Sequence, residues 1–246
     1  MAETPAGLPD GPGPQRGIGL VAPFDFALDR ELWRWLPDDL AWFTTRTPYL
    51  PVTVSLQMAE AVGDDQVVAR AVQDLLVAEP LAVAYACTSG SFVDGIAGER
   101  RLRDAMERAG APVAVTTSGA LLDALAALGV SRVAVATPYT EQVTARLADF
   151  LAEAGVATTR TTCLGLVEGI AKVGYPTVAR LVQQAVTDDA GAVFVSCTNL
   201  ATYDLIEPLE QLLDRPVLSA NQVTAWAALR SVGAKAVGPG QRLLSA

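Results

Sequence analysis

Short apolar runs rich in β-branched residues alternate along the chain with longer amphipathic runs of helical period. This alternation is typical of βαβ units, in which parallel strands are joined by crossover helices. The sequence predicts strands over 17–22, 81–88, 112–117, 132–137, 190–198 and 215–220, with weaker extended segments near 42–46 and 158–163. We therefore expect an α/β fold built on mostly parallel sheets.

Helix start and stop signals lie between these strands. Asp64 precedes an apolar face of helical spacing and is expected to cap that helix. Further helices are predicted over 118–129 and 140–154, each closed by a glycine. Pro176 suits the first turn of a fourth helix, whereas Pro208 predicts either an early-turn position or a kink.

An internal repeat divides the chain into two similar halves. The segment LAVAYACTSGSFVDG from Leu81 is echoed by GAVFVSCTNLATYDL from Gly191, and GIGLVAP from Gly17 is echoed by RVAVATP from Arg132. In each half a later Pro-Val segment follows, APVAVTT and RPVLSAN. Two such halves are expected to form pseudo-symmetric, Rossmann-like lobes whose strand ends meet across one crevice, the usual ligand site of such sheets.

The repeat also suggests a domain division. Residues 1–16, rich in Pro and Gly, are expected to form a disordered leader. An N-terminal lobe over 17–117 would be completed by a C-terminal helix over 221–246, and residues 118–220 would form the C-terminal lobe.

Composition narrows the possible functions. The net charge is −9 and Lys and Arg form no cluster, so neither nucleic acid nor a membrane surface is an expected partner. No apolar stretch is long enough to span a membrane and no export signal is seen, which predicts a cytoplasmic protein with free thiols. The chain contains no histidine, which excludes Ser-His-Asp and Cys-His machinery and any His-ligated metal.

Two of the three cysteines, Cys87 and Cys197, occupy equivalent positions of the repeat. Each is expected to end a strand just before a helix, where the helix dipole would stabilise a thiolate. Backbone N–H groups there, with the hydroxyls of Thr88, Ser89 and Thr198, would bind a carboxylate without Lys or Arg. The alternative is that these cysteines are small buried hydrophobes, which is how Cys163 is interpreted.

Three segments resemble a known group of enzymes. Cys87-Thr-Ser-Gly-Ser-Phe, Ser196-Cys-Thr-Asn-Leu and Ser219-Ala-Asn-Gln-Val-Thr-Ala-Trp are similar to the maleate cis-trans isomerase and arylmalonate decarboxylase branch of the aspartate/glutamate racemase superfamily. The resemblance implies two racemase-type lobes, no metal and no cofactor. Arylmalonate decarboxylases have Gly at the first cysteine position, so the presence of both cysteines resembles the isomerases more.

The resemblance also implies roles for single residues. Tyr139 in the Ala-Thr-Pro-Tyr segment would donate a hydrogen bond to a substrate carboxylate, and Thr198 and Asn199 would contact the substrate beside Cys197. Maleate isomerases carry Pro-Ser-Ser-Asn after the first strand, where this chain has Pro-Phe-Asp-Phe. We expect Asp25 and Phe26 to line the pocket and to change its substrate; alternatively, Asp25 caps the following helix.

The first functional hypothesis is a maleate isomerase-like enzyme in which Cys87 adds to an unsaturated carboxylate and Cys197 supplies a proton. The second keeps the site but racemises an amino or hydroxy acid, or decarboxylates an arylmalonate-type acid, through an enediolate. The third is a non-catalytic protein that binds a small acid. A homodimer or higher homo-oligomer is expected.

Overall fold

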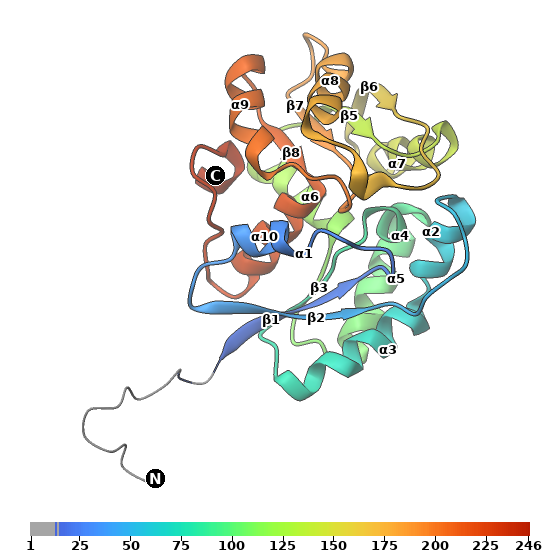
Figure 1. Ribbon diagram of the computed structural model, residues 1–246, viewed down its shortest axis with the longest axis vertical. Helices are drawn as coiled ribbons and strands as arrows, with labels where there is room; N and C mark the ends of the chain where they lie inside the picture. The colour runs from blue at the N-terminus through green and yellow to red at the C-terminus, as the bar shows by residue number, and fades with distance from the viewer. Residues whose placement is uncertain (1–12, 14) are drawn as a thin grey trace, which may run out of the picture.

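The computed structural model describes residue 13 and residues 15–246 of the chain, which form two α/β halves (Figure 1). Each half contains a four-stranded, all-parallel sheet. The first sheet has the order β2-β1-β3-β4, with β1 Arg16–Ala22, β2 Leu40–Arg46, β3 Val83–Tyr85 and β4 Ala114–Thr116. The second has the order β6-β5-β7-β8, with β5 Arg132–Thr137, β6 Ala157–Cys163, β7 Ala192–Val195 and β8 Val217–Ser219.

The two strand orders are identical once the second set is renumbered, so the structure confirms the predicted pair of pseudo-symmetric lobes. The repeated sequence segments fall on equivalent strands: β1 matches β5, β3 matches β7, and β4 matches β8. Both weaker extended segments are also strands, β2 and β6, at the outer edge of each sheet.

Helices connect and cover the strands (Figure 1). They are α1 Asp29–Leu32, α2 Leu56–Val62, α3 Asp65–Leu75, α4 Thr88–Phe92, α5 Gly95–Arg108, α6 Thr117–Ala127, α7 Glu141–Glu153, α8 Tyr175–Ala185, α9 Tyr203–Leu213 and α10 Ala220–Ser231. The Asp64 side chain accepts hydrogen bonds from the N–H groups of Gln66 and Val67, which confirms the predicted cap of α3. Pro176 lies in the first turn of α8, as predicted, whereas Pro208 lies inside α9.

Some predicted boundaries were wrong. The strands before the two cysteine turns end at Tyr85 and Val195, two residues before each cysteine. The C-terminal helix ends at Ser231 and does not continue to residue 246, because the chain turns at Gly233, whose φ is +74°. Of the predicted leader, residues 1–12 and 14 lie outside the described residues, and Arg16 already belongs to β1.

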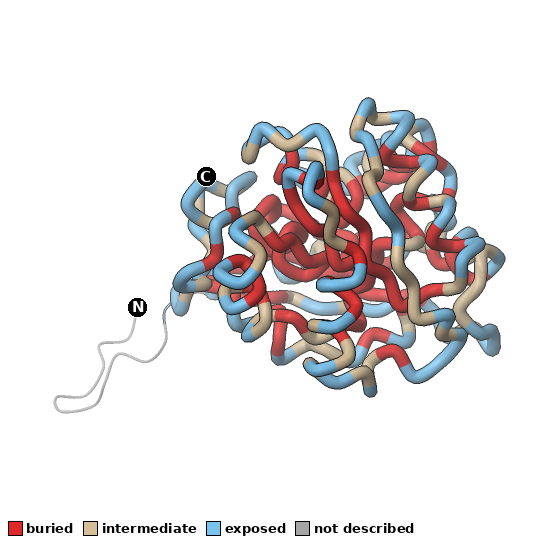
Figure 2. Tube along the Cα trace, turned by 90° about the horizontal axis from the view of Figure 1, so that it is seen from above, coloured by how far each residue is buried: buried red, intermediate tan, exposed pale blue. Residues whose placement is uncertain are grey.

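Buried residues fill the interior of the protein (Figure 2). Their apolar side chains form three clusters around the two sheets. The second sheet lies within one large apolar cluster. The cluster on one face of the first sheet includes Ile18 and Leu20 of β1 together with Ala225, Ala228 and Leu229 of α10. The last long helix therefore packs on the first sheet and ties the two halves together. Among the described residues, no helix is both long and apolar enough to cross a membrane.

Candidate active site

A small cavity lies where the carboxyl ends of the two sheets face each other. Its volume is about 30 Å³. Both Cys87 and Cys197 line it, each contributed by the turn after the third strand of its own sheet. Six further residues that the sequence singled out line the same cavity: Asp25, Thr88, Ser89, Tyr139, Thr198 and Asn199.

Cys87 lies at the start of α4, where it is the N-cap residue. Its side chain is buried, and Ser89 Oγ lies 3.9 Å from Sγ. Behind it, Ser91 Oγ donates to the carbonyl of Cys87 and contacts Ser118 Oγ at 2.6 Å. This buried hydroxyl pair fixes the turn that carries the thiol.

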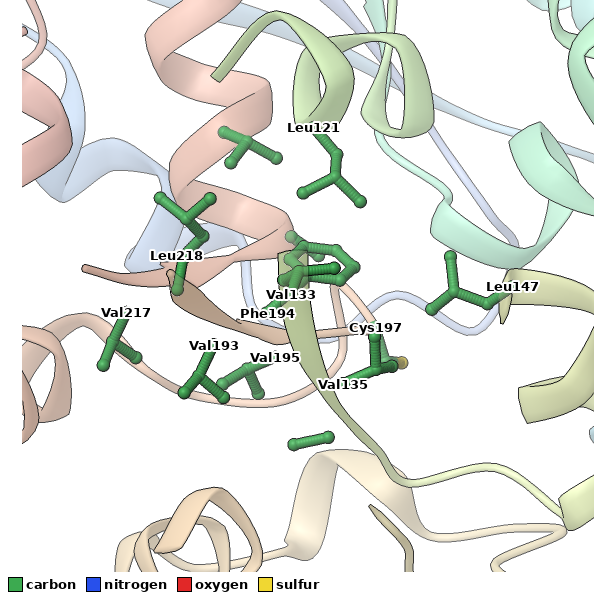
Figure 3. Close-up of a cluster of buried hydrophobic side chains, with 14 of the residues drawn as sticks. Leu121, Val133, Val135, Leu147, Val193, Phe194, Val195, Cys197, Val217 and Leu218 are labelled. Carbon is green, nitrogen blue, oxygen red and sulfur yellow. The ribbon is translucent and has the colours of Figure 1, made fainter. Parts of the chain in front are cut away.

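Cys197 is held in a different backbone conformation. Its φ is +90°, in the left-handed region that side chains other than Gly rarely adopt. Its carbonyl accepts from Leu200 N–H at 3.1 Å in a tight turn, and the next helix, α9, begins only at Tyr203. The prediction that both cysteines directly precede a helix is thus right for Cys87 and wrong for Cys197. Figure 3 shows Cys197 next to Val135 among the buried side chains of the second sheet's apolar cluster.

Burial makes both thiols weak acids. Burial raises the pKa of Cys87, although the Tyr85 hydroxyl and the Gly90 N–H act in the opposite direction. Burial raises the pKa of Cys197 to about 12, against the hydrogen bond from Tyr139. The expected low-pKa thiolate is therefore not seen, because desolvation outweighs the local hydrogen-bond donors. Both groups are protonated at neutral pH.

The hydroxyl groups next to the cysteines are not equivalent. Thr198 Oγ1 donates to the carbonyl of Ala86 at 3.1 Å, which ties the second turn to the first half. Thr88 Oγ1, at the matching position, is buried and has no hydrogen-bond partner among the described residues. A buried hydroxyl without a partner on a cavity wall is poised to bind a ligand oxygen. Thr88 is therefore the better placed of the two to contact a carboxylate.

Asp25 and Asn199 meet at one side of the cavity. Asn199 Oδ1 accepts from Ala27 N–H at 2.9 Å, and its Nδ2 donates to the carbonyl of Asp25 at 3.0 Å and to its carboxylate at 3.4 Å. Helix α1 begins at Asp29 with Leu28 as its N-cap, so the alternative that Asp25 caps this helix is excluded. Burial raises the pKa of Asp25, while hydrogen bonds from its own backbone and from Asn199 oppose the rise.

A second, outer cavity of about 270 Å³ adjoins the first. The two share Asp25, Val54, Met58, Ile170 and Asn199. The loop before α2 meets the loop after β6 above them, where Val54 N–H donates to the carbonyl of Val167 at 2.9 Å. This contact joins the two halves beside the site.

Tyr139 is buried beside Cys197, and its ring packs against Phe92 with centroids 6.4 Å apart. Phe26 does not line either cavity: a turn closed by the Phe26 N–H and the Pro23 carbonyl places it in the core of the first half. Phe24 lines the outer cavity instead. Cys163, at the end of β6, is half-buried and lines neither cavity.

Sequence reasoning missed several apolar wall residues, namely Val54, Met58 and Ile170, and the hydroxyl of Ser55. They lie in segments outside the internal repeat, so the sequence gives no sign that they belong to one site. Only the folded structure brings them together at the strand ends. Pro23 also lines the cavity and could have been found, because it precedes Phe24 and Asp25 in the turn that the sequence marked. No Lys or Arg lines the inner cavity within the described part of the chain.

Comparisons with known proteins identify the family. Residues 37–244 match the family model of arylmalonate decarboxylase. The chain is 34% identical to the arylmalonate decarboxylase of Bordetella bronchiseptica, over 88% of this chain and 90% of that protein. It is 27% identical to the maleate isomerase of Alcaligenes faecalis, over 67% of this chain and 68% of that protein. A liganded arylmalonate decarboxylase with one Gly changed to Cys and one Cys changed to Ser superposes with a TM-score of 0.85 at 32% identity, covering 93% of this chain and 98% of the other. The chain belongs to the arylmalonate decarboxylase family, whose relatives include maleate isomerases.

Proposed function

We propose that this protein is a cofactor-independent isomerase that uses two cysteines on a small unsaturated carboxylate, in the manner of a maleate cis-trans isomerase. The observation that carries the proposal is the placement of Cys87 and Cys197, one from each half, on the wall of the same cavity. The Thr88 hydroxyl, buried and without a partner, and the Ser89 hydroxyl supply ligands for the substrate carboxylate.

The reaction requires that one sulfur bonds to carbon while the other moves a proton. The Cys87 thiolate adds to one alkene carbon, and the displaced π electrons take the proton of Cys197 at the neighbouring carbon. Rotation about the resulting single bond exchanges cis for trans. The Cys197 thiolate then removes the proton again, the C=C bond re-forms, and the C–S bond breaks to restore the Cys87 thiolate. No oxidant, reductant or net proton is consumed.

The structure suggests this division of roles. A thiol whose pKa is raised to about 12, as at Cys197, stays protonated and suits the proton donor. Its left-handed backbone conformation is the kind of strain found at functional sites. Cys87 has the nearby hydroxyls of Ser89 and Tyr85 to stabilise a negative sulfur. Forming that thiolate still costs free energy, because the site is buried.

A second candidate keeps both thiols as acids and bases at the α-carbon of a substrate held as an enediolate, which would give racemisation or decarboxylation. The higher identity to an arylmalonate decarboxylase than to a maleate isomerase, 34% against 27%, favours it. A decarboxylase needs only one proton donor, however, and this cavity carries two thiols. A protein that merely binds a small acid has no use for either.

Proton NMR in deuterated water separates these reactions. A panel of cis-unsaturated mono- and dicarboxylates, α-amino and α-hydroxy acids, and arylmalonates is incubated with the enzyme, with Cys163→Ser as the matched control. Conversion of a cis acid to its trans isomer, lost in Cys87→Ser and Cys197→Ser, supports the proposal. Exchange of the α-proton in a saturated acid, or loss of a carboxyl group, would replace it with the second candidate.

A further inference from the structure

The two cysteine turns differ in the residue that lies two positions before each thiol. The position is occupied by Tyr85 in β3 and by Val195 in β7, although the strands are equivalent in the two sheets. Tyr85 is fully buried and lines neither cavity, so substrate contact does not explain it. The equivalent residue of the second half, Val195, has no hydroxyl, so the fold itself does not require a polar group at this position.

The Tyr85 hydroxyl bonds a backbone carbonyl and lies near the Cys87 sulfur. It donates to the carbonyl of Val62, at the end of α2, at 2.7 Å. It also faces Gly90 of α4 from the same side as the thiol: a Cβ at Gly90 would lie 2.3 Å from Tyr85 Oη and 3.2 Å from Cys87 Sγ. Only glycine leaves room for the two atoms to approach each other there.

We infer that Tyr85 is the positioning residue of Cys87, orienting its sulfur and stabilising its thiolate through a hydroxyl that turns from the Val62 carbonyl to Sγ. In the resting state the hydroxyl donates to Val62, and its oxygen can accept the thiol S–H. When the thiol loses its proton to water, rotation of the hydroxyl lets it donate to the negative sulfur. The inference rests on the proposed role of Cys87 as the nucleophile.

The titratable and hydroxyl groups around Cys87 are consistent with Tyr85 stabilising its thiolate. Burial raises the pKa of Tyr85 well above its usual value, so the phenol stays protonated and remains a donor. The other titratable groups that face Cys87 are Asp25, from the loop after β1, and Tyr139 and Cys197, from the second half. Asp25 raises the pKa of the thiol, as any nearby negative charge does. Tyr85 and Ser89 are the side chains that lower it.

The test is the pH dependence of thiol alkylation, measured separately for Cys87 and Cys197 with iodoacetamide and peptide mass spectrometry. In Tyr85→Phe the midpoint for Cys87 should rise by about one to two pH units, the value of a hydrogen bond to a charged group, while that of Cys197 stays where it is. Tyr203→Phe is the matched control, because its hydroxyl also bonds a backbone carbonyl, that of Val237, away from the cavity.

A second variant keeps the hydrogen bond to Val62 and so distinguishes a structural role of Tyr85 from an effect on the acidity of the Cys87 thiol. With 3-fluorotyrosine placed at position 85, the hydroxyl is a stronger donor, and the Cys87 midpoint should fall. An unchanged midpoint in both variants, with only a loss of thermal stability in Tyr85→Phe, would make the residue structural and overturn the inference. The readout needs no substrate, so a shifted midpoint without any isomerase activity would refute the proposed function and leave the role of Tyr85 intact.

Discussion

Asn199 holds the loop that carries Asp25: its amide oxygen accepts from Ala27 N–H at 2.9 Å, and its amide nitrogen donates to the Asp25 carbonyl at 3.0 Å. The two residues come from different halves and lie where the inner and outer cavities join. The Asn199 amide therefore makes its hydrogen bonds within the protein. Its side chain fixes the Asp25 carboxylate where the two cavities join, and we expect that carboxylate to influence which substrates bind.

Asp25→Asn tests this selection. A carboxylate 4 Å from a second substrate carboxylate repels it by about 1 kcal/mol in water and about 4 kcal/mol at an effective dielectric of 20. We expect the variant to lower the KM for maleate or a similar dicarboxylate by about fivefold or more. For a substrate that donates a hydrogen bond to Asp25, the KM should instead rise. Steady-state kinetics with both substrate types measure the change.

Asp29→Asn is the matched control for that experiment. Asp29 begins the next helix and pairs with Arg46 at 2.7 Å, but it lines neither cavity. Its substitution should leave the ratio of the two KM values unchanged. Equal effects of the two variants would mean that general surface charge, and not a pocket carboxylate, controls substrate choice.

The two cysteines should behave as a unit. We expect Cys87→Ser and Cys197→Ser each to reduce kcat by about 10²-fold or more, the usual contribution of a positioned acid or base. The double variant should be little worse than either single one, because both act in the same step. Cys163→Ser should retain its activity. Full activity of Cys87→Ser would leave Cys197 as the single essential thiol and favour a decarboxylase.

The threonines after the cysteines should respond in opposite ways. Thr88→Val removes a buried hydroxyl without a partner, so the free energy of unfolding should rise by about 1 kcal/mol while KM increases. Thr198→Val removes a hydroxyl that donates to the carbonyl of Ala86, so stability should fall by about 1 kcal/mol. Urea unfolding measures the change in stability, and steady-state kinetics measure the change in KM. A fall in stability in both variants would show that Thr88 has a structural partner.

The buried carboxyl of Glu31 links stability to pH. It accepts from the N–H and hydroxyl of Thr202 and from Asn221, yet burial raises its pKa above the ordinary 4.5. The folded state thus binds the proton more tightly than the unfolded chain. Its stabilising effect is complete below about pH 4.5 and is lost as the pH rises through the folded value.

Glu31→Gln removes this titration. The free energy of unfolding of the wild type, minus that of the variant, should therefore decrease as the pH rises from about 4.5 toward neutrality. Urea denaturation at several pH values measures the difference. A difference that grows with pH would mean that the three donors outweigh burial, and that the folded pKa is lowered.

The sequence predicted the parts of this protein that repeat. Strands and cysteine turns were found because β-branched runs and the Cys-Thr pair occur twice, and a duplicated pattern fixes equivalent places in two sheets. The thiol acidity was predicted wrongly: a low-pKa thiolate was expected, but burial raises the pKa of both cysteines, and burial depends on packing between distant segments that no local pattern records. Likewise, the bond between Asn199 and the Asp25 loop joins residues more than 170 positions apart, and no local pattern records it.

The packing of α10 on the first sheet also bears on how the chain is made. Ile18 and Leu20 are synthesised about 200 residues before Ala225, Ala228 and Leu229, which share their apolar cluster. Until α10 is made, one face of the first sheet lacks its cover. A premature stop before residue 220 would expose that apolar face permanently. Such a truncated product would be prone to aggregate and would be a natural target for chaperones.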